Sequence, residues 1–309
     1  MVSHAARLPE NEVAEVRALL ATATAADGVR PVSEEAELRL QHGGPPGGID
    51  LTARDAGGAL VGYARLEVPA GDPEAEAELV VRPQARRRGV GSALLSRLEE
   101  LAGGRPLRVW AHGELPGSAE LATGRGFTRA RVLLQMRRPL GGVDPEPQPK
   151  LPDGVTVRPF RPGTDEDAWL TVNSRAFAGH PEQGRWTADD LAVREAEPWF
   201  DPAGFFLAWC EQPGGDRLLG SHWTKVHPAG ETGDQPIGEV YVLGIDPDAQ
   251  GLGLGRALTD VGLAHLRRAG LSHVLLYVEE QNTTAVTLYE RTGFTRFAVD
   301  VSWRSTPAG

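Results

Sequence analysis

The feature that most constrains the fold of this chain is an internal repeat. Residues 78–95 (ELVVRPQARRRGVGSALL) match residues 241–259 (YVLGIDPDAQGLGLGRALT), so that Gly89 corresponds to Gly253, 164 residues later. A second match, Gly126-Phe127 with Gly293-Phe294, lies 167 residues apart. Solenoid repeats are only about 20 to 50 residues long. A repeat of this length therefore predicts two tandem copies of one domain.

A proline-rich segment separates the two copies. Residues 138–154 contain five prolines and no apolar periodicity, so they can continue neither a helix nor a central strand. We predict an N-terminal domain at 1–138, a linker at 139–154 and a C-terminal domain at 155–309. The length of 309 residues agrees with two domains, because one domain typically takes about 150 residues.

The order of elements predicts the fold class of each copy. Strand-like segments precede a glycine-bearing loop, a helix follows the loop, and a buried-type strand follows the helix. In the first copy these three elements are the strand 78–81, a helix with its apolar face at Val90, Leu94, Leu98 and Leu101, and the strand 107–111. The pattern predicts an α/β fold with a mixed sheet flanked by helices on both faces, once per copy.

Composition excludes several classes of function. The formal net charge of −10 argues against binding nucleic acid over the whole surface. No run of 18 apolar residues occurs, and Met1 to Glu10 lacks the apolar core of a secretion signal, so we expect no membrane contact and a cytoplasmic location. A single cysteine, Cys210, excludes an internal disulfide. The histidines are not at metal-ligand spacing, and we predict no metal site.

Each copy carries a glycine loop between a strand and a helix, at Arg86–Gly91 and at Gln250–Gly255. Backbone N–H groups and the positive end of the helix dipole converge there on one point, which suits an anion such as a pyrophosphate. Alone, such a glycine pair could be a simple turn, and Arg86 to Arg88 could be a solvated basic face. A dinucleotide-binding loop is disfavoured, because three or more strands precede the loop.

These motifs resemble a known superfamily. A strand, the pattern [Q/R]-x-x-G-x-G, a helix, then Asn282, Ala285 and Tyr289 and the Gly-Phe pair are similar to the GCN5-related N-acetyltransferases (GNAT). Longer stretches resemble the mycothiol synthase family more narrowly: FAGHPEQGRWT (177–187), WFDP (199–202), HWTKVHP (222–228) and LLYVEEQN (275–282). The resemblance covers nearly the whole chain and implies two tandem GNAT-like acetyltransferase domains.

The resemblance implies that both copies bind acetyl-CoA (CoA) as cofactor. In the second copy it assigns the pantetheine to Leu243, Gly244 and Ile245, the pyrophosphate to Gln250, Gly251, Leu252, Gly253, Leu254, Gly255 and Arg256, and the flank of the CoA arm to Asn282, Thr283, Thr284, Ala285, Val286 and Thr287. In the first copy it assigns Leu79, Val80, Val81, Arg86, Arg87, Arg88, Gly89, Val90, Gly91 and Ser92.

The resemblance also implies catalytic roles, with Glu239 as base and Tyr289 as acid. A modest base suffices for an α-amino group with a pKa near 8, and a phenol can protonate a leaving thiolate. Projected by the two offsets, these positions become Ala75 and Ala122. We therefore expect the first copy to bind acetyl-CoA without catalysis.

The substrate residues implied by the resemblance are Glu34, Glu182, Lys225, Glu239 and Tyr277. Glu34 belongs to the first copy, which would place the substrate cavity between the domains. Without the resemblance, such residues are more often surface charges or core aromatics. The implied substrate is a small pseudodisaccharide amine, and we expect a monomer.

The implied reaction is acetyl transfer to the cysteinyl amine of the glucosaminyl-inositol precursor of mycothiol (desacetylmycothiol), in the last step of mycothiol biosynthesis. Two alternatives stay open. One is a GNAT enzyme for another small amine, such as an aminoglycoside or a peptide. The other is a non-catalytic acetyl-CoA sensor, against which Glu239 and Tyr289 argue.

Overall fold

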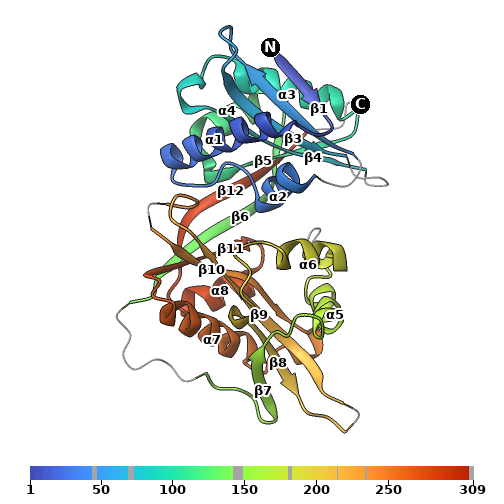
Figure 1. Cartoon of the computed structure of the whole chain (residues 1–309), viewed down its shortest axis with the longest axis vertical. Helices are drawn as coiled ribbons and strands as arrows, with labels where there is room; N and C mark the ends of the chain where they lie inside the picture. Colours follow the sequence, from blue (N-terminus) through green and yellow to red (C-terminus); the bar gives the residue numbers. More distant parts are fainter. Residues whose placement is uncertain are drawn as a thin grey trace.

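The computed structural model describes residues 1–43, 47–68, 73–141, 149–179, 183–213, 215–233 and 235–305. It has two lobes, one built mainly from the first half of the chain and the other from the second half (Figure 1). The elements of the first half are β1 (Val2–Ala5), α1 (Glu10–Asp27), α2 (Glu34–His42), β2 (Gly48–Arg54), β3 (Leu60–Glu67), β4 (Ala75–Val81), η1 (Pro83–Ala85), α3 (Val90–Leu101), β5 (Leu107–Ala111), η2 (His112–Glu114), α4 (Pro116–Gly124) and β6 (Thr128–Pro139).

The second half repeats this order. Its elements are β7 (Val155–Pro159), α5 (Glu166–Ala176), η3 (Gln183–Arg185), α6 (Ala188–Glu195), η4 (Pro202–Gly204), β8 (Phe205–Cys210), β9 (Arg217–His227), β10 (Ile237–Ile245), η5 (Pro247–Ala249), α7 (Leu254–Arg268), β11 (His273–Glu279), α8 (Thr283–Arg291) and β12 (Thr295–Arg304). The predicted α/β class with a mixed sheet and flanking helices is confirmed, but the prediction of a separate sheet in each copy is wrong, because one sheet contains the strands of both halves.

The strands of the described residues form one sheet, in the order β1-β2-β3-β4-β5-β12-β6-β11-β10-β9-β8-β7. The two halves exchange their last strands: β12 pairs with β5 of the first half, and β6 pairs with β11 of the second. Figure 1 shows β12 (red) running into the upper lobe while β6 (green) runs into the lower one. The boundaries at 138 and 154 stay a prediction, because one sheet joins both halves. Residues 142–148 of the predicted linker lie outside the described residues.

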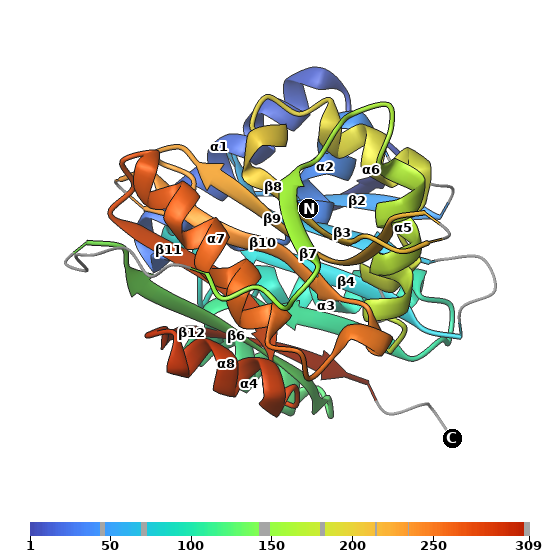
Figure 2. The ribbon, with the colours of Figure 1, turned by 90° about the horizontal axis from the view of Figure 1, so that it is seen from below.

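Helices cover both faces of the sheet. In the first half, α1 and α2 pack on one face through a core that includes Val16, Leu20 and Leu40, while α3 and α4 pack on the other. In the second half, α5 and α6 share a core with Phe205 and Trp223. Helices α7 and α8 pack against the strands in two other clusters of buried residues. Figure 2 shows α5 and α7 on different sides of β8 to β10. Amphipathic spacing explains these helices, since each buries one apolar stripe.

A mostly buried histidine links strands of the two halves. His112 follows β5, with Nδ1 3.1 Å from an Asp300 oxygen of β12 and Nε2 3.5 Å from a Glu78 oxygen of β4. Burial disfavours the charged ring, but Asp300 and Glu78 outweigh it and raise the pKa of His112 to about 10. The junction of the two halves therefore carries a charged cluster linking three strands.

This cluster predicts a pH-dependent stability. Between pH 6.5, the ordinary pKa of histidine, and about 10, the folded protein keeps a proton that the unfolded chain loses. The stabilisation by His112 is thus complete below pH 6.5 and disappears as pH rises through 10. We expect the melting temperature of the wild type to fall more steeply over this range than that of His112→Gln, as measured by thermal unfolding. Parallel slopes would contradict the assignment.

Candidate active site

Two strands diverge at the centre of the second half. The parallel strands β10 and β11 pair only from Gly238 to Val240 with Val274 to Leu276, although β10 continues to Ile245. On its other side, the pairing of β10 with β9 shifts register between Val240 and Val242, which is a β-bulge. Beyond the bulge, the backbone of Leu243, Gly244 and Ile245 no longer pairs with β11. Its groups on that side can bind a ligand that enters the gap.

The glycine loop follows this strand. Gly253 is the N-cap of α7 with φ of 78°, and Gly251 has φ of 81°. In the first half, Gly89 is the N-cap of α3 with φ of 85°. No side chain caps either helix, so each first turn presents unpaired N–H groups. A Cβ at Gly253 or Gly89 would meet no atom within 4 Å. Glycine is therefore required by the left-handed conformation and not by crowding within the protein.

The other residues predicted to bind CoA in the second half differ in how exposed their side chains are. Leu254 and Val286 turn their side chains into the core, so only their backbone could face a ligand. Asn282 is the N-cap of α8, and its side chain accepts a hydrogen bond from the Ala285 N–H at 3.1 Å. Most of the others are exposed: Gln250, Gly251, Leu252, Gly253, Arg256, Thr283, Thr284 and Thr287, while Gly255 is partly buried.

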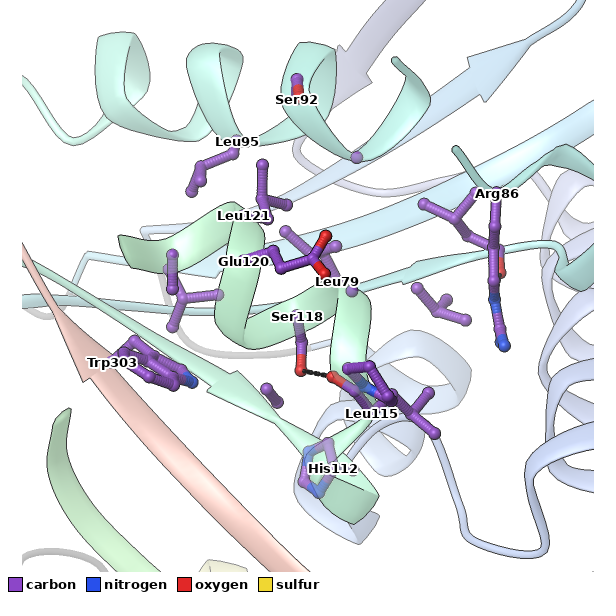
Figure 3. Close-up of a pocket in the computed structure, with 18 of the residues that line it drawn as sticks. Leu79, Arg86, Ser92, Leu95, His112, Leu115, Ser118, Glu120, Leu121 and Trp303 are labelled. Carbon is purple, nitrogen blue, oxygen red and sulfur yellow. Dashed lines mark hydrogen bonds between the residues drawn. The ribbon is translucent and has the colours of Figure 1, made fainter. Parts of the chain in front are cut away.

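The first half carries a cavity of about 720 Å³ at the equivalent place. Its wall includes most of the CoA residues predicted for this half, namely Leu79, Val80, Val81, Arg86, Arg87, Gly89, Gly91 and Ser92. Figure 3 shows Leu79 and Leu121 beside the cavity, with Ser92 on α3 and His112 at another side. Arg86 is held by Asp27, at 2.7 and 2.5 Å, and Arg87 pairs with Glu120. Arg88 and Val90 are not part of the wall.

A second cavity, of about 710 Å³, lies where the two halves meet. Glu34 of α2 lines it from the first half, and Glu239 of β10 and Tyr277 of β11 line it from the second. Glu182, predicted to contact the substrate, lies outside the described residues. Aromatic packing supports this wall: Trp186 and Tyr241 border the cavity and lie 6.3 Å apart, and both pack on Trp223.

Lys225 and Glu34 form an ion pair across the two halves, with Nζ against Oε1. The Lys225 side chain is only 3% exposed, and its ammonium lies 4.0 Å from the centre of the Trp199 ring. Burial alone would raise the pKa of Glu34, but Lys225 and Arg30 outweigh it and hold that pKa below its ordinary value. A buried lysine and a partly buried carboxylate thus form an ion pair between the two halves, and the carboxylate lies in the cavity wall.

Glu239 is buried, and its Oε2 lies 2.5 Å from Nε2 of His227. Tyr277 accepts a hydrogen bond from the Gln135 amide at 2.8 Å, and burial raises its pKa above the ordinary value. Tyr289 lies on α8 in a different environment. It is buried against Phe294, with ring centres 5.7 Å apart, and burial raises its pKa as well. Its hydroxyl therefore stays protonated well beyond neutral pH.

Comparisons with known proteins agree with this architecture. Residues 168–294 match the model of the acetyltransferase (GNAT) family, and residues 50–129 match that of an acetyltransferase (GNAT) domain. The mycothiol acetyltransferase of Geodermatophilus obscurus is 76% identical over 96% of both chains, and that of Thermobispora bispora is 56% identical over 94% of both. The chain belongs to the mycothiol acetyltransferase family.

Solved structures show the same fold at lower identity. A tandem GNAT protein from the clavulanic acid biosynthesis pathway has a TM-score of 0.76 at 21% identity, covering 100% of this chain and 99% of its own. A GCN5-related N-acetyltransferase from Sphaerobacter thermophilus has a TM-score of 0.70 at 24% identity, covering 98% and 95%. This member of the mycothiol acetyltransferase family is thus an N-acetyltransferase of tandem GNAT architecture, and it uses acetyl-CoA.

The residues present fit acetyl-CoA. The glycine loop offers unpaired N–H groups beside open space, which suits a pyrophosphate. The diverging strands leave backbone groups unpaired beside it. Among the described residues, no group of three or more His, Cys, Asp or Glu side chains is placed to hold a metal ion. None of the described helices is long and apolar enough to span a membrane.

The structure corrects one step of the comparison between the copies. Tyr241 is the extra residue of the bulge in β10, and the pairing of β3 with β4 has no such shift. Glu239 pairs with Leu275, and the matching pair in the first half is Glu76 with Arg108. Glu76, and not Ala75, is therefore the counterpart of Glu239. Fixed offsets missed it because a bulge moves every residue before it by one position.

The first half consequently keeps a carboxylate but not the phenol. Glu76 accepts a hydrogen bond from the Trp110 indole N–H at 2.6 Å, so its carboxylate is already engaged. Ala122 of α4 occupies the place of Tyr289 in this acetyltransferase, at the same offset of 167 as Gly126 and Gly293. Of the two predicted catalytic groups, the first half therefore lacks only the phenol.

Sequence reasoning missed several residues of the cavity between the halves. Tyr241 and Arg194 lie beside the Glu34–Lys225 pair, and the Arg194 Nε donates to the Tyr241 hydroxyl at 3.0 Å. His112 received no role, yet it joins the two halves. Alternate residues of a strand share a face of the sheet. The sequence alone could therefore have placed His227 on the same face of β9 as Lys225.

Proposed function

We propose that this acetyltransferase transfers an acetyl group to the cysteinyl amine of the glucosaminyl-inositol precursor of mycothiol. The observation that carries the proposal is the cavity between the halves, which Glu34 lines from the first half and Glu239 from the second. Carboxylates, arginines and tyrosines around one cavity suit an amine attached to a polyol, since they can accept hydrogen bonds from hydroxyl groups and donate hydrogen bonds to them. The high identity to mycothiol acetyltransferases supports this substrate.

The base in this proposal is Glu239. A substrate α-ammonium has a pKa near 8 and must lose one proton before its nitrogen can attack. Glu239 accepts that proton from the ammonium, directly or through one water. Its burial in the cavity wall places the carboxylate beside the amine and shields it from bulk water. Lys225 and Glu34 hold the sugar-inositol part and thereby orient the amine.

The acid in this proposal is Tyr289. Acetyl-CoA supplies the acetyl group as a thioester when it is bound. Burial keeps the Tyr289 hydroxyl protonated at neutral pH, so it can donate its proton to the leaving sulfur. In this proposal the donor binds along the backbone of Leu243 to Ile245, which does not pair with β11. The first half, with Ala122 in place of this phenol, binds acetyl-CoA and does not catalyse transfer.

The test is a steady-state assay with acetyl-CoA and a panel of amines. The panel contains the cysteinyl precursor, an aminoglycoside and a short peptide, and each product is identified by mass spectrometry. A thiol-reactive dye cannot report turnover alone, because the precursor itself carries a thiol. We expect kcat/KM to be highest for the precursor, with a product that keeps a free thiol. Preference for another amine would refute the substrate, and no transfer to any amine would favour the sensor.

A further inference from the structure

A row of three side chains connects the cavity between the halves with the surface. The His227 Nε2 lies 2.5 Å from Glu239, and its Nδ1 lies 3.0 Å from an oxygen of Glu231. The exposed fractions of the side chains are 9% for Glu239, 2% for His227 and 46% for Glu231. A buried ring thus bridges a carboxylate at the cavity and a carboxylate at the surface.

Strand register explains how this row forms. Glu239 faces Lys225 across the β9–β10 ladder, and Ile237 faces His227. Lys225 and His227 are alternate residues of β9, so both project from the same face as Glu239. The connection after β9 turns back through hydrogen bonds from Glu231 N to Pro228 O, at 3.3 Å, and from Gly230 N to Gly233 O, at 2.7 Å. This turn returns the Glu231 carboxylate to the ring.

The charges around His227 favour the imidazolium. Burial opposes the charged ring and Lys225 of the same strand repels it, but Glu231 of the connection and Glu239 of β10 outweigh both, and the pKa of His227 is raised. Farther out, the charge of Arg30, in the segment before α2, lowers the pKa of Glu231. The charge of Glu239 contributes to the raised pKa of Tyr277 of β11. The ring is therefore buried between two carboxylates that favour its charged form.

We propose that His227, held by Glu231, is a positioning residue that fixes one oxygen of Glu239 and thereby sets the orientation of this carboxylate in the cavity wall. Oε2 is occupied by the His227 ring, and Oε1 is left to take the proton from the nitrogen of the substrate ammonium. In this step the N–H bond breaks and an O–H bond forms at Oε1, and no other bond changes. The inference rests on the proposed role of Glu239 as base.

A second histidine in the same strand has a pKa shift in the opposite direction. His222 is also fully buried in β9, but its Nδ1 lies 2.7 Å from the Leu258 carbonyl oxygen of α7. Burial without a carboxylate partner lowers the pKa of His222 to about 4. It is therefore neutral at pH 7, and its partner residue in β10 is Leu243 and not Glu239. His222→Gln is a matched control for the loss of a buried histidine from β9.

The experiment measures pH profiles of kcat/KM for the amine with full-length His227→Gln, Glu231→Gln, His222→Gln and Glu239→Gln. Glutamine at 227 can donate a hydrogen bond but carries no charge. We expect the acid limb of its profile to move upward by about one pH unit, which lowers kcat/KM roughly tenfold at pH values on that limb, with an unchanged KM for acetyl-CoA. Glu231→Gln should move the limb in the same direction by less, and His222→Gln should leave it in place.

The outcomes separate the inference from the proposed function. A folded His227→Gln with a wild-type profile, beside an impaired Glu239→Gln, would overturn the positioning role and leave the base in place. An unimpaired Glu239→Gln would remove the base and the inference together. If His227→Gln does not fold, Glu231→Gln decides, because Glu231 is half exposed and tolerates the change. An unshifted limb in that variant would overturn the inference.

Discussion

Gly253→Glu is expected to abolish acetyl transfer, whereas Gly89→Glu should leave turnover largely intact. Both residues are N-caps of the helix that follows a glycine loop. A glutamate at either position places a carboxylate beside the N–H groups that would bind a pyrophosphate, and like charges repel. Because only the second half carries Tyr289, loss of acetyl-CoA from that half should remove the reaction. The measurement is kcat with saturating precursor, together with CoA binding by calorimetry.

The two positions are well matched as controls for each other. Their φ angles are 78° and 85°, and a Cβ added at either one would have no other atom within 4 Å. Any non-glycine residue therefore has a similar backbone cost at both, of about 1 to 2 kcal/mol. Gly253→Ala and Gly89→Ala carry that cost without the charge. Each glutamate variant should lose one CoA site, and equal loss of activity in two folded glutamate variants would contradict the division of labour.

Tyr289→Phe is expected to lower kcat by roughly 10² or more, which is typical of a lost general acid. The change removes one hydroxyl and keeps the ring against Phe294, so folding and CoA affinity should persist. Burial raises the pKa of Tyr289 above its ordinary value of 10, so the phenol ionises only at higher pH. The wild-type rate should therefore hold through neutral pH and decline only above pH 10, where ionised tyrosine cannot donate.

Glu239→Gln distinguishes the base from the acid. It should be slow at neutral pH and recover as rising pH deprotonates the substrate amine without help. The decline above pH 10 should persist in Glu239→Gln and be absent from Tyr289→Phe. The profiles of kcat against pH for both variants and the wild type check this. Wild-type rates in both would mean that other groups or water move the protons.

Much of the protein could be predicted from local sequence. The repeat, the two glycine loops and the helices after them depend on residues close together in the chain. Gly89 and Gly253 adopt a left-handed conformation that other residues rarely accept. The glycines in the sequence were therefore enough to predict a tight loop at each position. The mixed sheet with flanking helices also follows from apolar periodicity, because burial of one face drives each element onto the sheet.

The tertiary structure decided what depends on distant pairing. The exchange of β6 and β12 joins the halves into one sheet, and alternation along a strand does not specify its neighbour. The bulge at Tyr241 makes Glu76 the counterpart of Glu239, and it is visible only in the ladder with β9. Glu34 meets Lys225 although 191 residues separate them. Such contacts arise only when the whole chain packs, since each one requires burial and charge compensation from both halves at once.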